Sequence, residues 1–408
     1  MTITIDRLGM HGDGIAPGPI YVARTLPGEV IAGEVEGDRI VAPKIVTPSE
    51  MRVKAPCPHY ARCGGCALQH ARNDFVAGWK LDVVVAALAA HGIETEFRPL
   101  ITSSPRSRRR ATFSGRRLKS GALVGFHTRA SDTLVPIPDC HLLHDDLRGA
   151  LPMLEALTGI VGSRKGEVSF AVALSEAGLD VDMATTREID AKLVTDLAEL
   201  AREFDLARLS QRGDPILTRR APHVLFDGMR VVPPPGAFLQ ATPEGEVALR
   251  AAITEAVGPA KQITDLFAGS GTFALPLART AQVHAVEAEA AMTEALHLGW
   301  REAKRVKNLT VETRDLFRRP LLPDEFRKTD AVVIDPPRAG AEAQVAELAK
   351  AQVGRIAFVS CNPVTFARDA KTLQQAGYRL NWVQVVDQFR WSPHIELAAS
   401  LTAPHIAP

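Results

Sequence analysis

Cysteine is scarce in this sequence, with only five among 408 residues. An odd and sparse count argues against a disulfide framework and favours the reduced thiols of a cytoplasmic protein. No run of about 18 apolar residues occurs, and residues 1–10 lack the charged and then apolar layout of a signal peptide, so membrane and secreted proteins are not expected. The formal net charge of +1 excludes a uniformly basic coat for nucleic acid but not a local patch. We therefore expect a cytoplasmic monomer that does not bind membranes.

The composition is that of a globular protein, and its 408 residues predict two to three domains at roughly 150 residues each. Residues 1–50 hold short β-rich runs separated by glycines, which predicts a small β-barrel. Residues 51–235 read as a mixed α+β domain with a cysteine-rich loop and a helix near 74–92 that could pack on the next domain. Three prolines in the segment 233–238 mark a boundary. Over 236–408, buried strands alternate with helices, which predicts an α/β, Rossmann-like domain with a parallel sheet and ligands at the carboxyl ends of its strands.

A glycine-rich loop follows the first strand of this C-terminal domain. The sequence DLFAGSGTFA, from Asp265 to Ala274, ends a strand and opens a helix, and its glycines let the backbone approach a ligand closely. Glu287 ends the next strand, where its carboxylate can accept both hydroxyls of a ribose. Taken alone, the pattern also fits a dinucleotide fingerprint, and a tight turn that binds nothing stays an alternative.

Two further acids bear on the cofactor. Asp335 begins an Asp-Pro-Pro-Arg motif that forms either a rigid lip over the cofactor's reactive end or a strand-terminating turn. Asp315 follows another strand, where it accepts from an adenine amino group or lies on the surface. No Gly-Lys-Ser/Thr follows the glycines, so a phosphate cradle is not expected. A cofactor with a nucleoside, a carboxylate and no phosphate fits best, and S-adenosylmethionine has this chemistry.

A nucleophile and a base are suggested near the C-terminus. Cys361 directly precedes Asn362 and Pro363, a typical helix start, and the positive end of the helix dipole would stabilise a thiolate there. The alternative is an inert buried thiol. His394 and Glu396 are two residues apart, so they share one face of the last predicted strand. A carboxylate beside an activated thiolate suggests a general base, although an acid so near the terminus is often solvated.

These segments together resemble a known family. DLFAGSGTFALPLA, VEAEA, DPPRAG, FVSCNPVTFARD and HIEL, in this order, resemble the uridine-5-methyltransferases of RNA, and CPHYARCGGCALQH resembles their iron–sulfur motif. The resemblance covers residues 57 to 400, and the N-terminal barrel resembles the family's RNA-binding TRAM domain. It implies a class I methyltransferase fold that uses S-adenosylmethionine and an iron–sulfur cluster.

The resemblance also implies roles for single residues. Cys361 would add to C6 of the target uracil, and Glu396 would remove the C5 proton after methyl transfer. The residues that would line the cofactor site are Gln240, Phe267, Thr272, Glu287, Asp315 and Asp335. A cytosine-5 enzyme would carry a second catalytic cysteine where this chain has Arg338, so uridine is the expected base.

The other four cysteines form a candidate metal site. Cys57, Cys63 and Cys66 lie close together in sequence, and Cys140 follows 74 residues later. Four thiolates suit a [4Fe–4S] cluster or structural zinc. Zinc more often has two Cys-x2-Cys pairs, so the spacing favours the cluster, and the resemblance favours it further.

A basic stretch runs from Phe97 to Ser131, with nine lysines and arginines and no acid. Such a stretch predicts a phosphate-binding surface, although a charge run is often only a solvated face. The candidate RNA-binding residues in it are Arg106, Arg108, Arg109, Arg110, Arg116 and Arg117. Because the target base must leave its stack to react, single-stranded loops are expected substrates.

The resemblance favours 23S rRNA over tRNA, because the ribosomal members carry the four cysteines and the TRAM-like barrel. A tRNA methyltransferase remains an alternative, and so does an RNA-binding module without activity. An NAD-dependent oxidoreductase is a third alternative, but it leaves Cys361, the four cysteines and the basic stretch unexplained.

Overall fold

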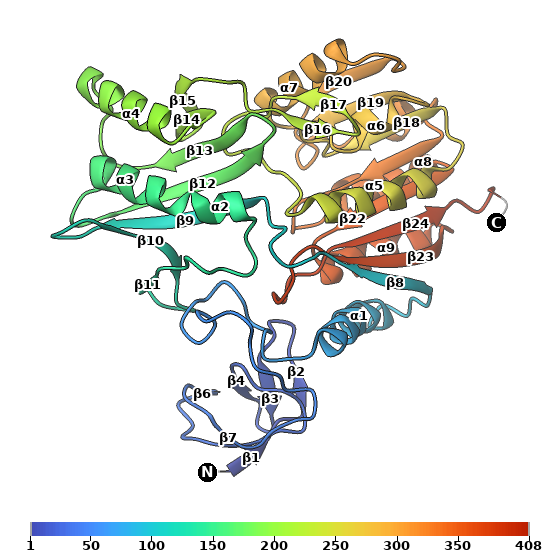
Figure 1. The fold of residues 1–408 in the computed structure, drawn as a ribbon. Coiled ribbons are helices and arrows are strands. Elements are labelled where there is room, and N and C mark those ends of the chain that lie inside the picture. The colour runs from blue at the N-terminus through green and yellow to red at the C-terminus, as the bar shows by residue number, and fades with distance from the viewer. Residues whose placement is uncertain (1, 407–408) are drawn as a thin grey trace.

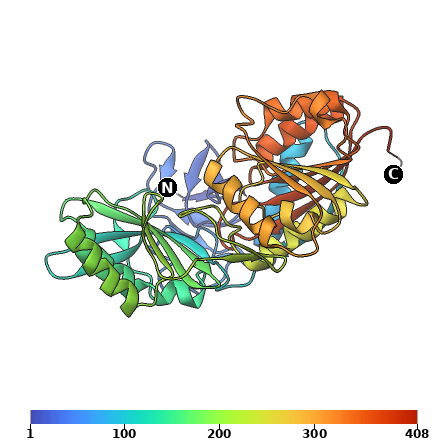
Figure 2. The same cartoon turned by 90° about the horizontal axis from the view of Figure 1, so that it is seen from above.

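The computed structural model describes residues 2–406, which form three units (Figure 1). A small N-terminal unit projects from two larger units. Seen from above, the larger units lie side by side, with the middle of the chain in one and the C-terminal part in the other (Figure 2). Within residues 2–406, no helix has both the length and the apolar character that crossing a membrane requires.

The N-terminal unit is β-rich, as predicted. Its strands are β1 (Thr2–Thr4), β2 (Arg7–Leu8), β3 (Gly14–Ala16), β4 (Ile20–Val22), β5 (Val30–Ala32), β6 (Arg39–Ile40) and β7 (Lys44–Thr47). They form two small sheets with the strand orders β1-β5-β7 and β2-β3-β4-β6. Buried side chains from both sheets, including Val22, Ile31 and Ile40, make one shared apolar core with Ile5, which lies between β1 and β2.

The middle unit is a seven-stranded sheet with helices packed on it. Its strands are β9 (Arg110–Arg117), β10 (Ala122–His127), β11 (Leu134–Val135), β12 (Glu167–Ser175), β13 (Gly178–Ala184), β14 (Arg208–Gln211) and β15 (Asp214–Thr218). Its helices are α2 (Asp145–Gly149), α3 (Leu151–Val161) and α4 (Ala191–Glu203). The strand order is β11-β10-β9-β12-β13-β14-β15. Phe113 and Phe170 on neighbouring strands are fully buried under the helices, which makes this the core of the unit.

The C-terminal unit is built on an eight-stranded sheet. Its strands are β8 (Glu96–Thr102), β18 (Gln262–Leu266), β19 (Gln282–Glu287), β20 (Leu309–Thr313), β21 (Ala331–Ile334), β22 (Arg355–Ser360), β23 (Arg379–Asp387) and β24 (Leu397–Thr402). Its helices are α1 (Asn73–Ala89), α5 (Pro243–Val257), α6 (Ala274–Leu277), α7 (Ala290–Glu302), α8 (Glu342–Ala351), α9 (Pro363–Gln375) and the 3-10 helix η1 (Pro323–Phe326). The strand order is β20-β19-β18-β21-β22-β24-β23-β8.

Helices cover both faces of this sheet. Along β22, Ala357 and Val359 belong to one buried cluster, and Ile356 and Phe358 belong to another. Because successive side chains of a strand point to opposite faces, these are the two faces of the sheet. Helix α5 packs on the first cluster, and α1, α8 and α9 pack on the second. The predicted Rossmann-like architecture is therefore confirmed for this part of the chain.

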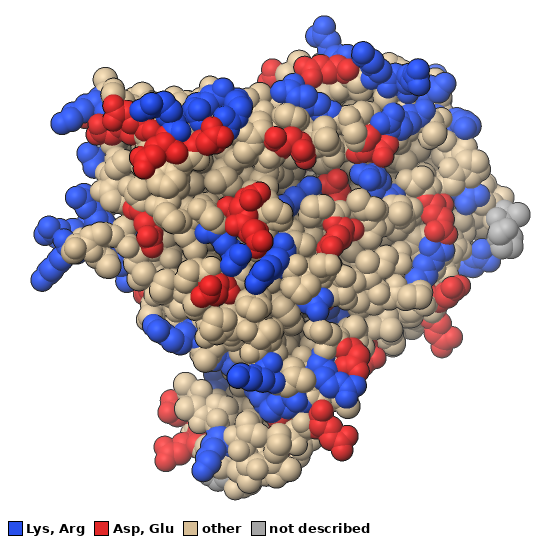
Figure 3. Space-filling model, viewed as in Figure 1, with Lys and Arg blue, Asp and Glu red and all other residues tan. Residues whose placement is uncertain are grey.

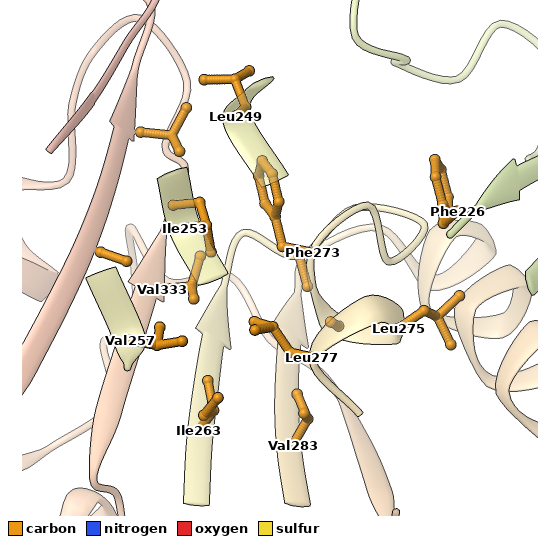
Figure 4. Close-up of a cluster of buried hydrophobic side chains, with 14 of the residues drawn as sticks. Phe226, Leu249, Ile253, Val257, Ile263, Phe273, Leu275, Leu277, Val283 and Val333 are labelled. Carbon is orange, nitrogen blue, oxygen red and sulfur yellow. The ribbon is translucent and has the colours of Figure 1, made fainter. Parts of the chain in front are cut away.

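Two segments upstream of the predicted boundary at residue 236 belong to the C-terminal unit. Strand β8 pairs in parallel with β23 and so adds a strand to this sheet, and α1 packs against α9. Residues 73–102 therefore belong to the C-terminal unit and not to a central domain. The hairpin of β16 (Val224–Phe226) and β17 (Met229–Val231) also joins its core, where Phe226 approaches Leu275 (Figure 4). Without β8, the backbone of β23 would form an unpaired edge.

The predicted last strand, which was expected to carry His394 and Glu396, is wrong in its extent. Strand β23 ends at Asp387 and β24 begins at Leu397, so both residues lie in the connecting loop 388–396. Pro393 cannot donate a ladder hydrogen bond, and Trp391 has a φ of 60°, which breaks an extended chain. The loop reverses the chain, so β24 is antiparallel to β22 and β23 and the sheet is mixed.

The β16–β17 hairpin offers a test of this domain assignment. Phe226 is 1% exposed, so Phe226→Ala should lower the free energy of unfolding by about 3–5 kcal/mol through a lost transfer term and a cavity. Urea unfolding followed by circular dichroism measures the change. Leu225→Ala is the matched control, because Leu225 lies on the same strand but is 44% exposed. Equal midpoints for the two variants would contradict a core role for the hairpin.

Candidate active site

A cavity of about 600 Å³ opens at the carboxyl ends of the parallel strands. Seven of the predicted catalytic and cofactor-binding residues line it, namely Gln240, Phe267, Glu287, Asp315, Asp335, Cys361 and Glu396. Thr272 does not line it, since it lies half-buried in the turn before α6. The sheet thus brings together residues that are up to 156 positions apart, from Gln240 to Glu396.

The glycine-rich loop turns sharply after β18. Phe267 and Gly269 have φ values of 62° and 56°, and a side chain at Gly271 would come within 2.4 Å of Leu296. The amide of Gly269 donates to Glu287 Oε2 at 3.0 Å. Helix α6 spans only four residues, so a helix terminus contributes less here than the sequence predicts. The loop and the carboxylate of Glu287 form one hydrogen-bonded unit at the cavity wall.

Asp265 is a buried acid that the sequence analysis did not single out. It is 0% exposed, and neither of its carboxyl oxygens has a hydrogen-bond partner. Burial, with Asp335 and Glu287 nearby, raises its pKa well above the usual value. Asp265 does not line the cavity, and the amide of Ala274 acts against the rise of its pKa, so it belongs to the support of the site and not to its surface. Asp265 is the first residue of the glycine-rich motif, and this position is the feature of the sequence by which it could have been found.

Cys361 follows β22 directly and precedes the N-cap of α9. The side chain of Asn362 accepts from the amide of Val364 at 3.1 Å and donates to the carbonyl of Arg338 at 2.9 Å. This ties the cysteine turn to the Asp-Pro-Pro-Arg loop. Burial, then the carboxyls of Glu396 and Asp335, raise the pKa of the Cys361 thiol to about 11, although Arg338 acts against them. The predicted stabilised thiolate is therefore wrong for the free protein.

Glu396 is buried and held by an amide that the sequence analysis missed. Gln388 Nε2 donates to Glu396 Oε2 at 3.1 Å and to Gln240 Oε1 at 2.7 Å. The other end of the same amide, Gln388 Oε1, accepts from the backbone of Ala241 at 2.8 Å. Burial and the neighbouring Asp335 raise the pKa of Glu396, and burial raises that of Asp335. Gln388 thus fixes the direction of a carboxyl that gains a proton easily.

Aromatic rings line the other side of the cavity. The rings of Phe267 and Phe317 are 5.5 Å apart, and Phe317 is 50% exposed. Phe238 is 54% exposed, with the guanidinium of Arg110 4.4 Å from its ring centre. Asp315 caps its own turn by accepting from the amide of Phe317 at 3.0 Å. Flat apolar surfaces beside carboxylates suit planar heterocycles.

Comparison with known proteins gives a consistent family. A model described as tRNA (Uracil-5-)-methyltransferase matches residues 236–403. An "uncharacterized RNA methyltransferase" of Brucella suis biovar 1 is 41% identical over 403 residues, covering 98% of this chain and 97% of the relative. The 23S rRNA (uracil(1939)-C(5))-methyltransferase RlmD of Erwinia tasmaniensis is 31% identical over 97% of this chain and 94% of its own. The chain belongs to the RNA uracil-5-methyltransferase family. It is an enzyme of that class.

A solved structure has the same fold along nearly the whole chain. The Pyrococcus abyssi tRNA (uracil-54, C5)-methyltransferase, solved with S-adenosyl-L-homocysteine, superposes with a TM-score of 0.78 at 24% identity, covering 98% of this chain and 99% of that one. The arrangement of all three units is thus that of a known uracil-5-methyltransferase.

The four remaining cysteines of this methyltransferase converge between the N-terminal and middle units. Cys57, Cys63 and Cys140 are buried, Cys66 is half-buried, and none forms a disulfide. Burial raises the pKa of the Cys66 thiol, and each of Cys57, Cys63 and Cys140 raises it further, so the four cysteines lie in one region of the structure. Within residues 2–406, no group of three or more His, Cys, Asp or Glu is close enough to hold a metal ion.

Two arginines of the basic stretch are turned inward, which differs from their predicted place on an RNA-facing surface. Arg109 forms an ion pair with the buried Glu246 and donates to the carbonyl of Gln240 at 3.0 Å. Arg110 donates to the carbonyl of Leu239. Both arginines therefore bind the backbone of the segment 239–240, so their positive charge is used inside the protein.

The other four candidate RNA-binding arginines are dispersed. Arg108 lines the active-site cavity, and Arg116 pairs with Glu167. Arg106 and Arg117 are exposed. In Figure 3, blue side chains also mark the tip that projects where Figure 1 has the β9–β10 hairpin. The exposed positive charge is therefore spread over several places and not gathered in one stripe.

The raised pKa of Cys361 predicts how the thiol reacts. Its alkylation by iodoacetamide should be slow at pH 7 and accelerate as the pH rises toward about 11, because only the thiolate reacts. Glu396→Gln removes a negative neighbour and should move this profile to lower pH. Mass spectrometry of the Cys361 peptide measures the rate. Glu302→Gln, at an exposed position, is the control and should leave the profile unchanged.

Proposed function

We propose that the protein transfers a methyl group from S-adenosylmethionine to C5 of a uridine in RNA, with 23S rRNA as the substrate. The observation that carries this proposal is the joint position of Cys361 and Glu396 on one cavity wall, with Asp335 close enough to raise the pKa of both. A nucleophile and a base from different strand ends meet there, beside the Asp-Pro-Pro-Arg loop.

Covalent activation explains why both groups are needed. C5 of uracil is a poor nucleophile, so the Cys361 thiolate adds to C6 and moves an electron pair toward C5 and O4. C5 then forms the bond to the methyl group that S-adenosylmethionine supplies, and the sulfonium–methyl bond breaks. Glu396 takes the C5 proton, the C6–sulfur bond breaks, and Cys361 leaves as a thiolate. Glu396 finally passes the proton to solvent, so the enzyme is regenerated.

The charge and shape of the cavity support a cationic nucleoside cofactor. Asp335, which lines the cavity, is an acid for which a sulfonium or an ammonium group is a suitable partner. Glu287 would accept the ribose hydroxyls, and Asp315 would accept from the adenine amino group beside the ring of Phe267. A positive charge bound beside Asp335 also reduces the field that raises the pKa of Cys361.

The Erwinia relative acts, by its name, on 23S rRNA, whereas the Pyrococcus structure is of a tRNA enzyme. We favour 23S rRNA because the relative with that substrate aligns over nearly its whole length above 30% identity. We further propose that residues 2–50 are a TRAM-like RNA-binding unit. Arg106 and Arg117, which are exposed, are the best candidates among the basic stretch for phosphate contacts.

We propose a [4Fe–4S] cluster at Cys57, Cys63, Cys66 and Cys140. Burial raises the pKa of the Cys63 and Cys140 thiols, and backbone donors act against it. The amide of Gly65 donates to Cys63 Sγ at 3.3 Å, and the amides of Leu142 and Leu143 favour the thiolate of Cys140. The charge of Arg108 likewise favours negative sulfurs at Cys66 and Cys140. A cluster there would cross-link the loop to the middle unit.

RNA that carries 5-fluorouridine tests the mechanism. Fluorine at C5 cannot leave as a proton does, so incubation with S-adenosylmethionine should trap a covalent complex on a denaturing gel. Cys361→Ala should give no shifted band. On unmodified RNA, Glu396→Gln should accumulate the same adduct, because methyl transfer proceeds and C5 proton removal does not. A panel of 23S and tRNA fragments assigns the substrate, and no band with either RNA would refute the covalent mechanism.

Anaerobic purification tests the cluster. We expect broad absorbance near roughly 400 nm, four irons per chain and loss of both in Cys66→Ser. Ser49→Ala, at a residue outside the cysteine loop, is the control and should retain the spectrum. A colourless protein with one zinc per chain would replace the cluster by a structural zinc site.

A further inference from the structure

The loop 388–396 carries Gln388, His394 and Glu396, and a side chain from the first quarter of the sequence holds it. Lys80, on α1, is 307 residues from Asp387, the last residue of β23. Its Nζ atom lies 2.5 Å from Asp387 Oδ1, and the two side chains are only 0% and 3% exposed. This is an ion pair deep in the protein, beside but outside the active-site cavity.

The same ammonium also binds the backbone of the loop. It donates to the carbonyl of Phe389 at 3.2 Å and to the carbonyl of His394 at 2.9 Å. An ammonium has three hydrogens, so these two carbonyls and Asp387 use all of them. Phe389 lies at the start of the loop and His394 lies two residues before Glu396. One cation therefore fixes both ends of the loop.

The middle of the loop is held independently. The amides of Ala67 and Leu68 donate to the carbonyl of Trp391 at 2.9 and 3.0 Å, and the Trp391 side chain is buried in the core of the middle unit. Removal of Lys80 would therefore free the carbonyls of Phe389 and His394, next to Gln388 and Glu396, and not the centre of the loop. The carbonyl of Glu396 would still accept from the amide of Val386 at 2.8 Å, so the change expected is a shift of the carboxyl and not a loss of the loop.

We propose that Lys80 is a positioning residue for the catalytic base: by binding both ends of the loop it sets the direction of the Glu396 carboxyl relative to Cys361. The ion pair alone does not explain the site, because buried ion pairs are often replaced by apolar pairs without loss of stability. The two carbonyl contacts are what an apolar pair cannot reproduce. The proposal rests on the proposed function in that Glu396 accepts the C5 proton.

Two variants separate positioning from charge compensation. Lys80→Met removes all three hydrogen bonds and leaves Asp387 as an unpaired buried acid. Lys80→Met with Asp387→Asn removes the charge as well, and should recover most of the lost thermal stability.

We expect kcat of this double variant to stay roughly 10- to 100-fold below that of the wild type, because a displaced catalytic group lowers the rate even in a folded enzyme. KM for S-adenosylmethionine should change less than twofold, and the covalent adduct should accumulate on unmodified RNA. Recovery of full kcat by the double variant would overturn the proposal.

Hydrogen–deuterium exchange without RNA tests the loop apart from activity. Amides of residues 388–396 should exchange faster in the double variant than in the wild type. Val84→Ala is the matched control, because Val84 is 0% exposed on the same helix and does not touch the loop through a hydrogen bond. It should lower stability and leave exchange in the loop unchanged. Unchanged exchange in the double variant would overturn the role of Lys80. Absence of any adduct between the wild type and RNA that carries 5-fluorouridine would refute the proposed function instead.

Discussion

Two carboxyl groups, the buried Asp265 and the half-buried Asp335, lie at the carboxyl edge of the C-terminal sheet, and neither forms an ion pair in the part of the chain that the structure describes. Burying an acid without a cation disfavours its ionised form, so the pKa of each rises. The same field acts on Glu396 and on Cys361. The carboxyl groups and the thiol therefore stay protonated more readily than usual. A bound cation would favour their ionised forms, and a sulfonium cofactor is such a cation.

The competition at Cys361 can be judged from magnitudes. The N-terminus of a helix favours an anion by about 0.3–1 kcal/mol at most exposed sites. Burial and the carboxyls of Glu396 and Asp335 act in the opposite direction and raise the pKa of the thiol to about 11, which corresponds to roughly 3 kcal/mol. Burial and the two carboxyls therefore outweigh the start of α9. The local sequence around Cys361 predicted the helix correctly but could not contain the acids, which come from other strands.

This explains which parts of the site the sequence could predict. The glycine-rich loop, Glu287, Asp335 and Cys361 follow directly on strands, and strand ends meet at one edge of a parallel sheet. Gln388 and Lys80 act across 148 and 307 residues, and no short pattern records such contacts. The loop 388–396 was mistaken for a strand because its alternating residues fit a strand period. Only the turn at Trp391 and the antiparallel return of β24 reveal the difference.

The basic stretch shows a related limit of composition. Nine positive charges without an acid suggest a partner outside the protein, yet several of their partners are acids and carbonyls far along the chain. Arg98 pairs with Glu255, and Arg109 pairs with Glu246, both on α5. Arg109 therefore joins the segment before the middle unit's sheet to α5, whereas Arg98 joins β8 to α5 within the C-terminal unit. Because a guanidinium offers several donors in fixed directions, it suits ion pairs and hydrogen bonds between elements of the protein as well as it suits phosphates. A run of positive charges in a sequence is evidence for RNA binding only to the extent that its side chains have no partners inside the protein.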